Sequence, residues 1–267
     1  MQGATTPFGG RPRLARRLER EHWLLLAALL ALAALGWIVT DDRMDGMVAG
    51  PGMDLGGLGF YVTVWVVMMA AMMFPSAAPA VLVYHRMRAP ADGKPERAPR
   101  DATALFVGGY LAVWTAVGLF AYVLLEALRK IHFDAIAWDR GGPYLAGAVI
   151  VTAAVYELTP WKDLCLTHCR SPLMFLAEHW RSGRAGALRV GAVHGARCVG
   201  CCWALMAVLF AVGVMSIGWM AFVAALIAVE KLLPWRRVAN LGVAGLLLAL
   251  GLAVAFFPDQ VPGLLSN

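Results

Sequence analysis

Apolar residues along this chain gather into seven segments separated by shorter polar stretches. The segments cover about residues 23–39, 60–84, 102–128, 143–158, 190–216, 219–233 and 238–257. Most of them approach the roughly 20 residues that an α-helix needs to cross a bilayer's hydrocarbon core. The residue-by-residue alternation of a transmembrane β-barrel is not seen in the sequence. The pattern predicts an all-α fold, a polytopic membrane helix bundle of about seven transmembrane helices.

The stretch between the fourth and fifth segments, residues 161–188, is too polar to span a membrane. Within it, Ser171 can cap a helix and Pro172 suits a first helical turn. We therefore predict a short interfacial helix near residues 172–180. The predicted organisation is a basic cytoplasmic tail (1–21), one transmembrane helical domain (22–258) and a C-terminal tail (259–267).

Composition agrees with a membrane protein, because hydrophobic residues make up 60% of the chain and charged residues only 15%. A soluble domain carries about a quarter charged residues. Lysine and arginine concentrate in the N-terminal tail, in the stretches 85–101 and 161–189, and at Arg236 and Arg237. Basic loops stay in the cytoplasm, so we predict a cytoplasmic N-terminus and a C-terminus outside. The net charge of +6 is therefore explained by basic residues on the cytoplasmic side of the membrane. We expect the lipid bilayer, and not nucleic acid, as partner.

All five cysteines lie close together in the sequence, in two short motifs. The motifs read Cys165-Leu-Thr-His168-Cys169 and Cys198-Val-Gly-Cys201-Cys202. In a helix, spacings of three and four residues place each set on one face. Thiolate and imidazole suit zinc or copper, and cytoplasmic cysteines more often bind metal or do redox chemistry than form disulfides. We predict that these six residues are metal ligands in a site within residues 157–202, although buried cysteine also packs as a small apolar group.

Methionines offer a second set of soft ligands, and thiolate together with thioether selects Cu(I). Four of them share a broad face of the second apolar segment: Met68, Met69, Met72 and Met73. Pro75 removes a helical hydrogen bond, and a bend there would open room beside them. Ordinary packing of these four side chains remains an alternative. The sequence also leaves open whether three methionines of the loop 41–59 bind metal: Met44, Met47 and Met53.

Two glutamates lie within or at the ends of apolar segments, where an ionisable group is costly and usually faces the bundle interior. The predicted topology brings Glu157 and Glu230 to the same depth as the cysteines, in the cytoplasmic half. We predict both as further metal ligands. For Glu157 the alternative is an ion pair with Lys162 or Lys231 that holds helices together.

Four stretches of the chain resemble a known family. They are residues 65–75 (WVVMMAAMMFP), 156–172 (YELTPWKDLCLTHCRSP) and 198–206 (CVGCCWALM), and Glu230-Lys231 shortly before Pro234. Together they resemble a bacterial family of predicted metal-binding integral membrane proteins, over about residues 60–235. The resemblance implies metal binding and a multi-pass location in the bacterial inner membrane.

The sequence favours a membrane protein that acquires, traffics or delivers a transition metal, with copper favoured over zinc. Such a protein would need a partner protein that gives or receives the metal. Two alternatives remain: a thiol-disulfide oxidoreductase that pairs the two cysteine motifs, and an assembly subunit with structural zinc. A role other than that of an enzyme is favoured. The identity of the metal, the choice between transport, storage and delivery, and the oligomeric state remain open.

Overall fold

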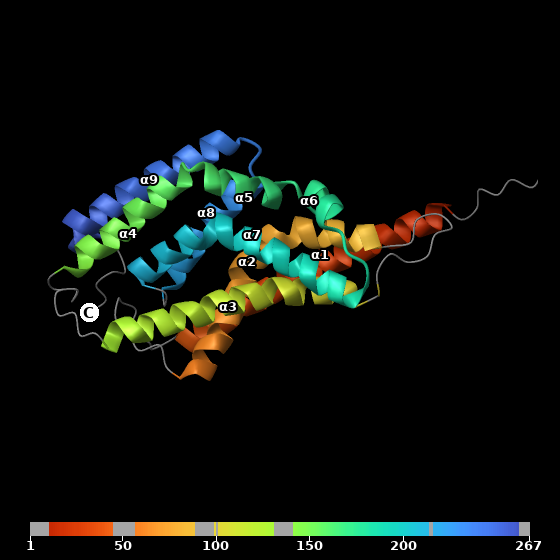
Figure 1. Cartoon of the computed structure of the whole chain (residues 1–267), viewed down its shortest axis with the longest axis horizontal. Coiled ribbons are helices and arrows are strands. Elements are labelled where there is room, and N and C mark those ends of the chain that lie inside the picture. The colour runs from red at the N-terminus through yellow and green to blue at the C-terminus, as the bar shows by residue number, and fades with distance from the viewer. Residues whose placement is uncertain are drawn as a thin grey trace, which may run out of the picture.

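The computed structural model describes residues 11–44, 57–88, 99, 101–130, 141–213 and 216–261. Within these ranges all regular structure is helical (Figure 1), which confirms the predicted all-α class. In chain order the elements are α1 (Arg11–Met44), α2 (Leu58–Arg88), α3 (Ala102–Lys130), α4 (Gly142–Glu157), α5 (Pro160–Arg170), α6 (Pro172–His179), α7 (Gly183–Val212), α8 (Ile217–Leu232), α9 (Arg236–Phe256) and the 3-10 turn η2 (Pro258–Gln260).

Five helices are long and apolar enough to cross a membrane: α1, α2, α3, α7 and α9. α4 and α5 meet at a bend of 67° and pass the same test as one broken span, which would make six. α8 has 16 residues and a length of about 24 Å, less than a bilayer core. A helix therefore occupies each of the seven apolar segments, and the count of seven spans is approximate. Which side of the membrane each end faces stays a prediction.

The polar stretch after α4 folds into two short helices. The side-chain oxygen of Thr159 accepts a hydrogen bond from the backbone N–H of Lys162, and Pro160 occupies the first turn of α5. The chain turns again at Ser171 before Pro172 begins α6. α6 matches the predicted short helix near 172–180. The helical state of α5 places its cysteines on one face.

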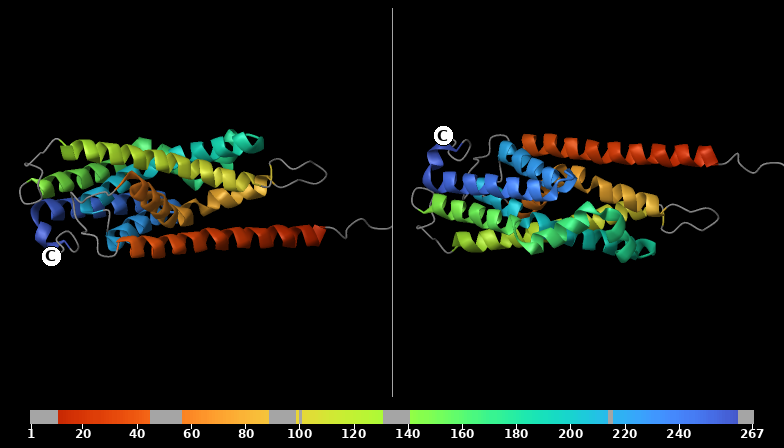
Figure 2. Two further views of the ribbon diagram at one scale, coloured as in Figure 1. Left: turned by 90° about the horizontal axis from the view of Figure 1, so that it is seen from below. Right: turned by 90° about the horizontal axis from the view of Figure 1, so that it is seen from above.

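Three pairs of neighbouring helices form the body of the bundle: α1 with α2, α3 with α7, and α4 with α9. Figure 2 shows α1 as a long rod along one side. α3 and α7 approach closely because glycines face the partner backbone: a Cβ at Gly191 would overlap the carbonyl oxygen of Phe106, and one at Gly109 that of Leu188. Small residues permit this kind of close helix packing in membranes. The approach brings Tyr110 of α3 against the cysteine face of α7.

α2 stays helical through Pro75 and Pro79, and Figure 1 shows its axis changing direction along its length. A proline ring displaces the carbonyl four residues earlier and removes one helical hydrogen bond. The four methionines before Pro75 are all buried in the core of the bundle. The bend predicted from the sequence is thus accommodated without ending the helix.

Candidate metal centre

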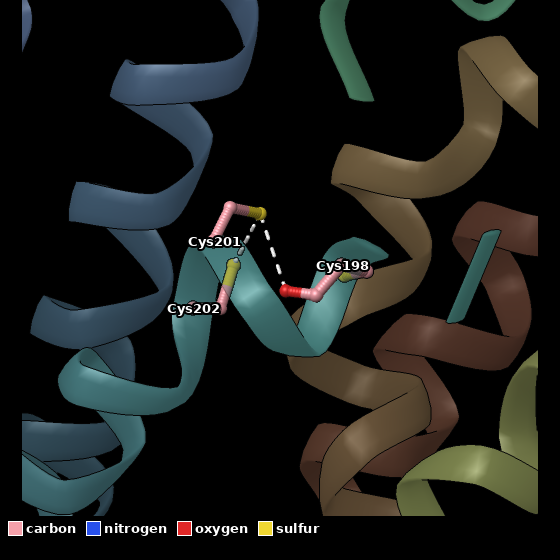
Figure 3. Close-up of side chains that lie close together, drawn as sticks. All are labelled: Cys198, Cys201 and Cys202. Carbon is pink, nitrogen blue, oxygen red and sulfur yellow. Dashed lines mark hydrogen bonds between the residues drawn. The ribbon is translucent and has the colours of Figure 1, made fainter. Parts of the chain in front are cut away.

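The three cysteines of α7 form a compact thiol cluster. The side chains of Cys198, Cys201 and Cys202 are each 1% exposed, and their sulfur atoms all lie within 4.8 Å of one another. Figure 3 shows the short contacts: Cys201 Sγ lies 3.3 Å from Cys202 Sγ and donates to the carbonyl oxygen of Cys198 at 3.2 Å. A soft metal ion would therefore meet three sulfurs on one helix.

Cys169 of α5 adds a fourth sulfur from a different helix. Its Sγ lies 3.7 Å from Cys201 Sγ. Metal–sulfur bonds of about 2.3 Å in a tetrahedral site place sulfurs about 3.8 Å apart, close to this spacing. The residues present fit a thiolate-bound Cu(I) or Zn²⁺ ion. The two cysteine motifs, 33 residues apart at Cys165 and Cys198, therefore meet in space.

The other two residues of the α5 motif have different surroundings. Cys165 is half-buried and lies against Gly200, where an added Cβ would be 2.6 Å from its sulfur. The His168 Nδ1–H donates to the carbonyl oxygen of Leu164 at 2.7 Å, and its ring lies 6.4 Å from that of Phe175. The structure thus brings Cys169, and not His168, to the sulfurs of α7.

A lysine and a tyrosine contact the cluster from neighbouring helices. Lys231 Nζ of α8 lies 3.1 Å from Cys198 Sγ, and Tyr110 Oη of α3 lies 3.1 Å from the same sulfur. Both side chains are buried. A buried ammonium compensates the charge of thiolates in a medium of low dielectric. Sequence reasoning gave neither residue a role at the cysteines; the signal available for Lys231 was a charge inside an apolar segment, and Tyr110 offered none.

The methionines of α2 share the core of the bundle with the cysteines. Each is at most 2% exposed. Lys231 Nζ, which contacts Cys198, also reaches the hydroxyl of Ser76 at 3.5 Å, one turn after Met72 and Met73. The thioethers therefore line the α2 side of the same region, and their role as ligands stays a prediction. Met47 and Met53, and the side chain of Met44, lie outside the described residues.

Glu157 and Glu230 converge on a lysine. Lys162 Nζ, fully buried, donates to Glu230 at 2.6 and 2.7 Å and also to Glu157 Oε2. The other oxygen of Glu157 accepts no hydrogen bond from the described residues. Two buried carboxylates around one ammonium tie α4, α5 and α8 together. The ion pair weighed as an alternative for Glu157 is thus formed, with Lys162 as the partner.

Further polar contacts hold α5 against the end of α8 and the beginning of α9. Arg170 donates to the backbone oxygens of Glu230, at 2.6 Å, and Leu233. The Arg236 guanidinium donates to Thr167 Oγ1 at 2.9 Å, and Asn240 donates to Asp163 at 3.3 Å. We call these contacts, together with the Lys162 ion pairs, the α5 latch. The latch fixes the helix that carries Cys169.

Comparison with known proteins assigns the chain to a family. A family model of copper chaperones, PpoB2, matches residues 62–254, a range that includes every cysteine and helices α3 to α8 in full. No curated protein and no solved structure matches the chain. Since the family match covers most of the sequence and the cysteine cluster lies inside it, the chain belongs to the PpoB2 copper chaperone family.

Proposed function

We propose that the protein is an integral membrane Cu(I)-binding protein that delivers the ion to another protein. Cys169, Cys198, Cys201 and Cys202 are the proposed ligands. The observation that carries the proposal is the convergence of four thiols from α5 and α7, three of them buried within 4.8 Å of one another, in a chain of a copper chaperone family.

The donor set favours Cu(I) over harder ions. Thiolates select soft metals, and an apolar surrounding keeps water from completing a larger coordination shell. Cu(I) held by thiolates carries a net negative charge, which the Lys231 ammonium beside Cys198 reduces. The methionines of α2 supply a neutral, soft lining on the same side of the core.

The placement of buried charge favours delivery over transport through the membrane. In the part of the chain that the structure describes, the buried lysines and glutamates form a single group beside the thiol cluster: Glu157, Lys162, Glu230 and Lys231. They occupy the end of α4, the first turn of α5 and the last turn of α8. A transporter should offer polar groups along a full path across the membrane, whereas these four residues gather in one place. We place the site in the cytoplasmic half of a bacterial inner membrane, from the distribution of lysine and arginine.

Elemental analysis of protein purified in detergent under reducing, anaerobic conditions tests this function. We expect about one copper ion per chain, as a single closed thiolate site would hold. The double variant Cys198→Ser/Cys202→Ser should lose the copper, whereas Val199→Ala, on the same helical turn, should retain it. Copper at the wild-type level in the double variant would refute the proposal.

A thiol-disulfide oxidoreductase is the second candidate, since the 3.7 Å between Cys169 and Cys201 sulfurs allows a disulfide after a small movement. In that reaction the two thiols would lose two electrons and two protons to a quinone, which would become a quinol. Thiol trapping after addition of a quinone distinguishes the candidates. A Cys169–Cys201 disulfide that forms and is reduced again in turnover would favour the oxidoreductase. Reduced cysteines throughout would favour the copper protein.

A structural zinc site is the third possibility, because four thiols form the closed donor set typical of structural zinc. The same elemental analysis would find zinc in place of copper. Removal of structural zinc with a chelator should unfold the bundle, whereas removal of delivered copper should leave its helical circular dichroism unchanged.

A further inference from the structure

The candidate metal ligands of α5 connect the buried cluster with the surface. Cys165, His168 and Cys169 are all half-buried, and the sulfur of Cys169 contacts that of Cys201 on α7. Positions 165 and 168 are neighbours on one helix edge because they are three residues apart. The same edge carries Leu164, which is 61% exposed. One short helix therefore links the interior of the cluster to its surface.

The contacts of His168 leave one ring nitrogen suited to bind metal. Its Nδ1–H donates a hydrogen bond to the carbonyl oxygen of Leu164. When the ring is neutral, Nε2 therefore carries the free electron pair. Histidine ligands usually make this type of hydrogen bond through the nitrogen that does not bind the metal. The bond fixes the orientation of the ring along the helix.

Cys165 lies beside the buried cysteines of α7. Its sulfur occupies the space left by the missing side chain of Gly200, the residue before Cys201. It also lies one helical turn from Cys169, whose sulfur contacts Cys201. The three cysteines of α7 are each 1% exposed, so ligands of another molecule cannot reach them directly.

We propose that Cys165 and His168 form an exchange site, through which Cu(I) enters and leaves the buried thiol cluster. The inference rests on the proposed copper function and names the face at which the partner acts. The partner is a molecule that carries Cu(I) on thiolates. At each step a bond from copper to the next ligand forms before a bond to the previous ligand breaks. Copper stays Cu(I), and where one thiol replaces another, the proton of the incoming thiol passes to the thiolate that is released.

Separate measurements of copper binding and copper exchange test the proposal. The copper-loaded protein in detergent is mixed with bathocuproine disulfonate, a water-soluble Cu(I) chelator, and the coloured complex is followed by stopped-flow absorbance. We expect Cys165→Ser to retain the copper of the wild type but to transfer it about tenfold or more slowly, a loss in the range seen when residues around a metal site are changed. His168→Gln should slow transfer in the same direction.

Leu164→Ala is the matched control, because it shortens an exposed side chain on the same turn of α5 and offers no ligand in either form. Its transfer rate should equal that of the wild type. Wild-type transfer rates in both Cys165→Ser and His168→Gln would overturn the exchange site and leave the copper function standing. Loss of copper from Cys165→Ser at equilibrium would overturn it too, since Cys165 would then be a holding ligand. A wild-type protein without copper would instead refute the function itself.

Discussion

The two cysteine motifs have the same spacing but different surroundings. The motif on α7 lies in the middle of a 30-residue helix, and all three of its cysteines are buried. The motif on α5 lies on an 11-residue helix with only Lys162 and Leu166 buried, and its cysteines are half-buried. The α7 cysteines lie within the core of the bundle, whereas the α5 cysteines pack against that core from outside. The α5 latch ties their helix to α8 and α9. The buried thiol cluster and the proposed exchange site thus use the same residue types on helices that are held in place differently.

The largest effect is expected from the α5 latch. Lys162→Met leaves two buried carboxylates without their ammonium, and breaking a buried ion pair in this way costs about 3–5 kcal/mol. Thermal unfolding in detergent should show that loss. The triple variant Glu157→Gln/Lys162→Met/Glu230→Gln, which removes all three charges, should recover most of it. Arg184→Ala is the control, since its ion pair with Asp101 is exposed and is worth less than about 1 kcal/mol. Equal losses in Lys162→Met and Arg184→Ala would contradict the role of the latch.

The next effect distinguishes the two motifs as metal ligands. Cys201 contacts the sulfurs of both Cys169 and Cys202, so Cys201→Ser should weaken copper binding by about 100-fold, the upper end for changes around a metal site. Competition titration against a Cu(I) chelator measures the affinity. Cys165→Ser should remain close to the wild type in the same titration. Similar affinities for the two variants would show that both motifs hold the ion in the same way.

A substitution that moves a thiol without removing it sharpens the comparison. Gly200→Ala places a Cβ 2.6 Å from Cys165 Sγ, and the thiol should rotate away from α7. The gain in helix propensity of about 1 kcal/mol offsets the local crowding. We therefore expect wild-type copper content, little change in unfolding temperature, and slower copper transfer by stopped flow. Unchanged transfer would show that the position of Cys165 against α7 does not matter for exchange.

The smallest effect concerns the exposed part of the latch. Thr167→Ala removes the hydrogen bond from Arg236, with an expected loss of about 0.5–1 kcal/mol in unfolding free energy. Thr152→Ala is matched to it, because both hydroxyls also donate to the carbonyl four residues earlier in their own helix. The difference between the two variants isolates the contact between helices. A difference of zero would restrict the latch to its buried members.

Local pattern was enough for most of the helices. Apolar runs predicted α1, α2, α3, α7 and α9 because a span must bury its backbone polar groups within its own helix. Ser171 and Pro172 predicted α6 from capping chemistry. The helical state of α5 could not be predicted from an apolar run, since polar and apolar residues mix along it. In the structure Leu166, Cys165 and Cys169 pack against the core, and polar side chains bind α8 and α9.

The candidate site was predicted in part. The spacing of the two motifs identified the cysteines. The predicted topology placed them at the same depth as Glu157 and Glu230, because the direction of each helix fixes which helix ends lie near one another. Spacing could not show that the sulfur of Cys169 contacts Cys201, whereas the ring of His168 donates a hydrogen bond to a carbonyl oxygen of its own helix. It also gave no role to Tyr110, 88 residues from the sulfur that it contacts.

The amino-acid sequence by itself determined a helical scaffold with segments apolar enough to span a membrane and the presence of soft ligands, since hydropathy and residue type are properties of single positions and short segments. Tertiary structure alone decided which cysteines are buried, which carboxylates form ion pairs with Lys162, and that the Lys231 ammonium contacts the sulfur of Cys198. The physical reason is that burial and pairing depend on the angle and depth at which helices pack, and α5, which carries Cys165 and Cys169, follows α4 at a bend of 67°.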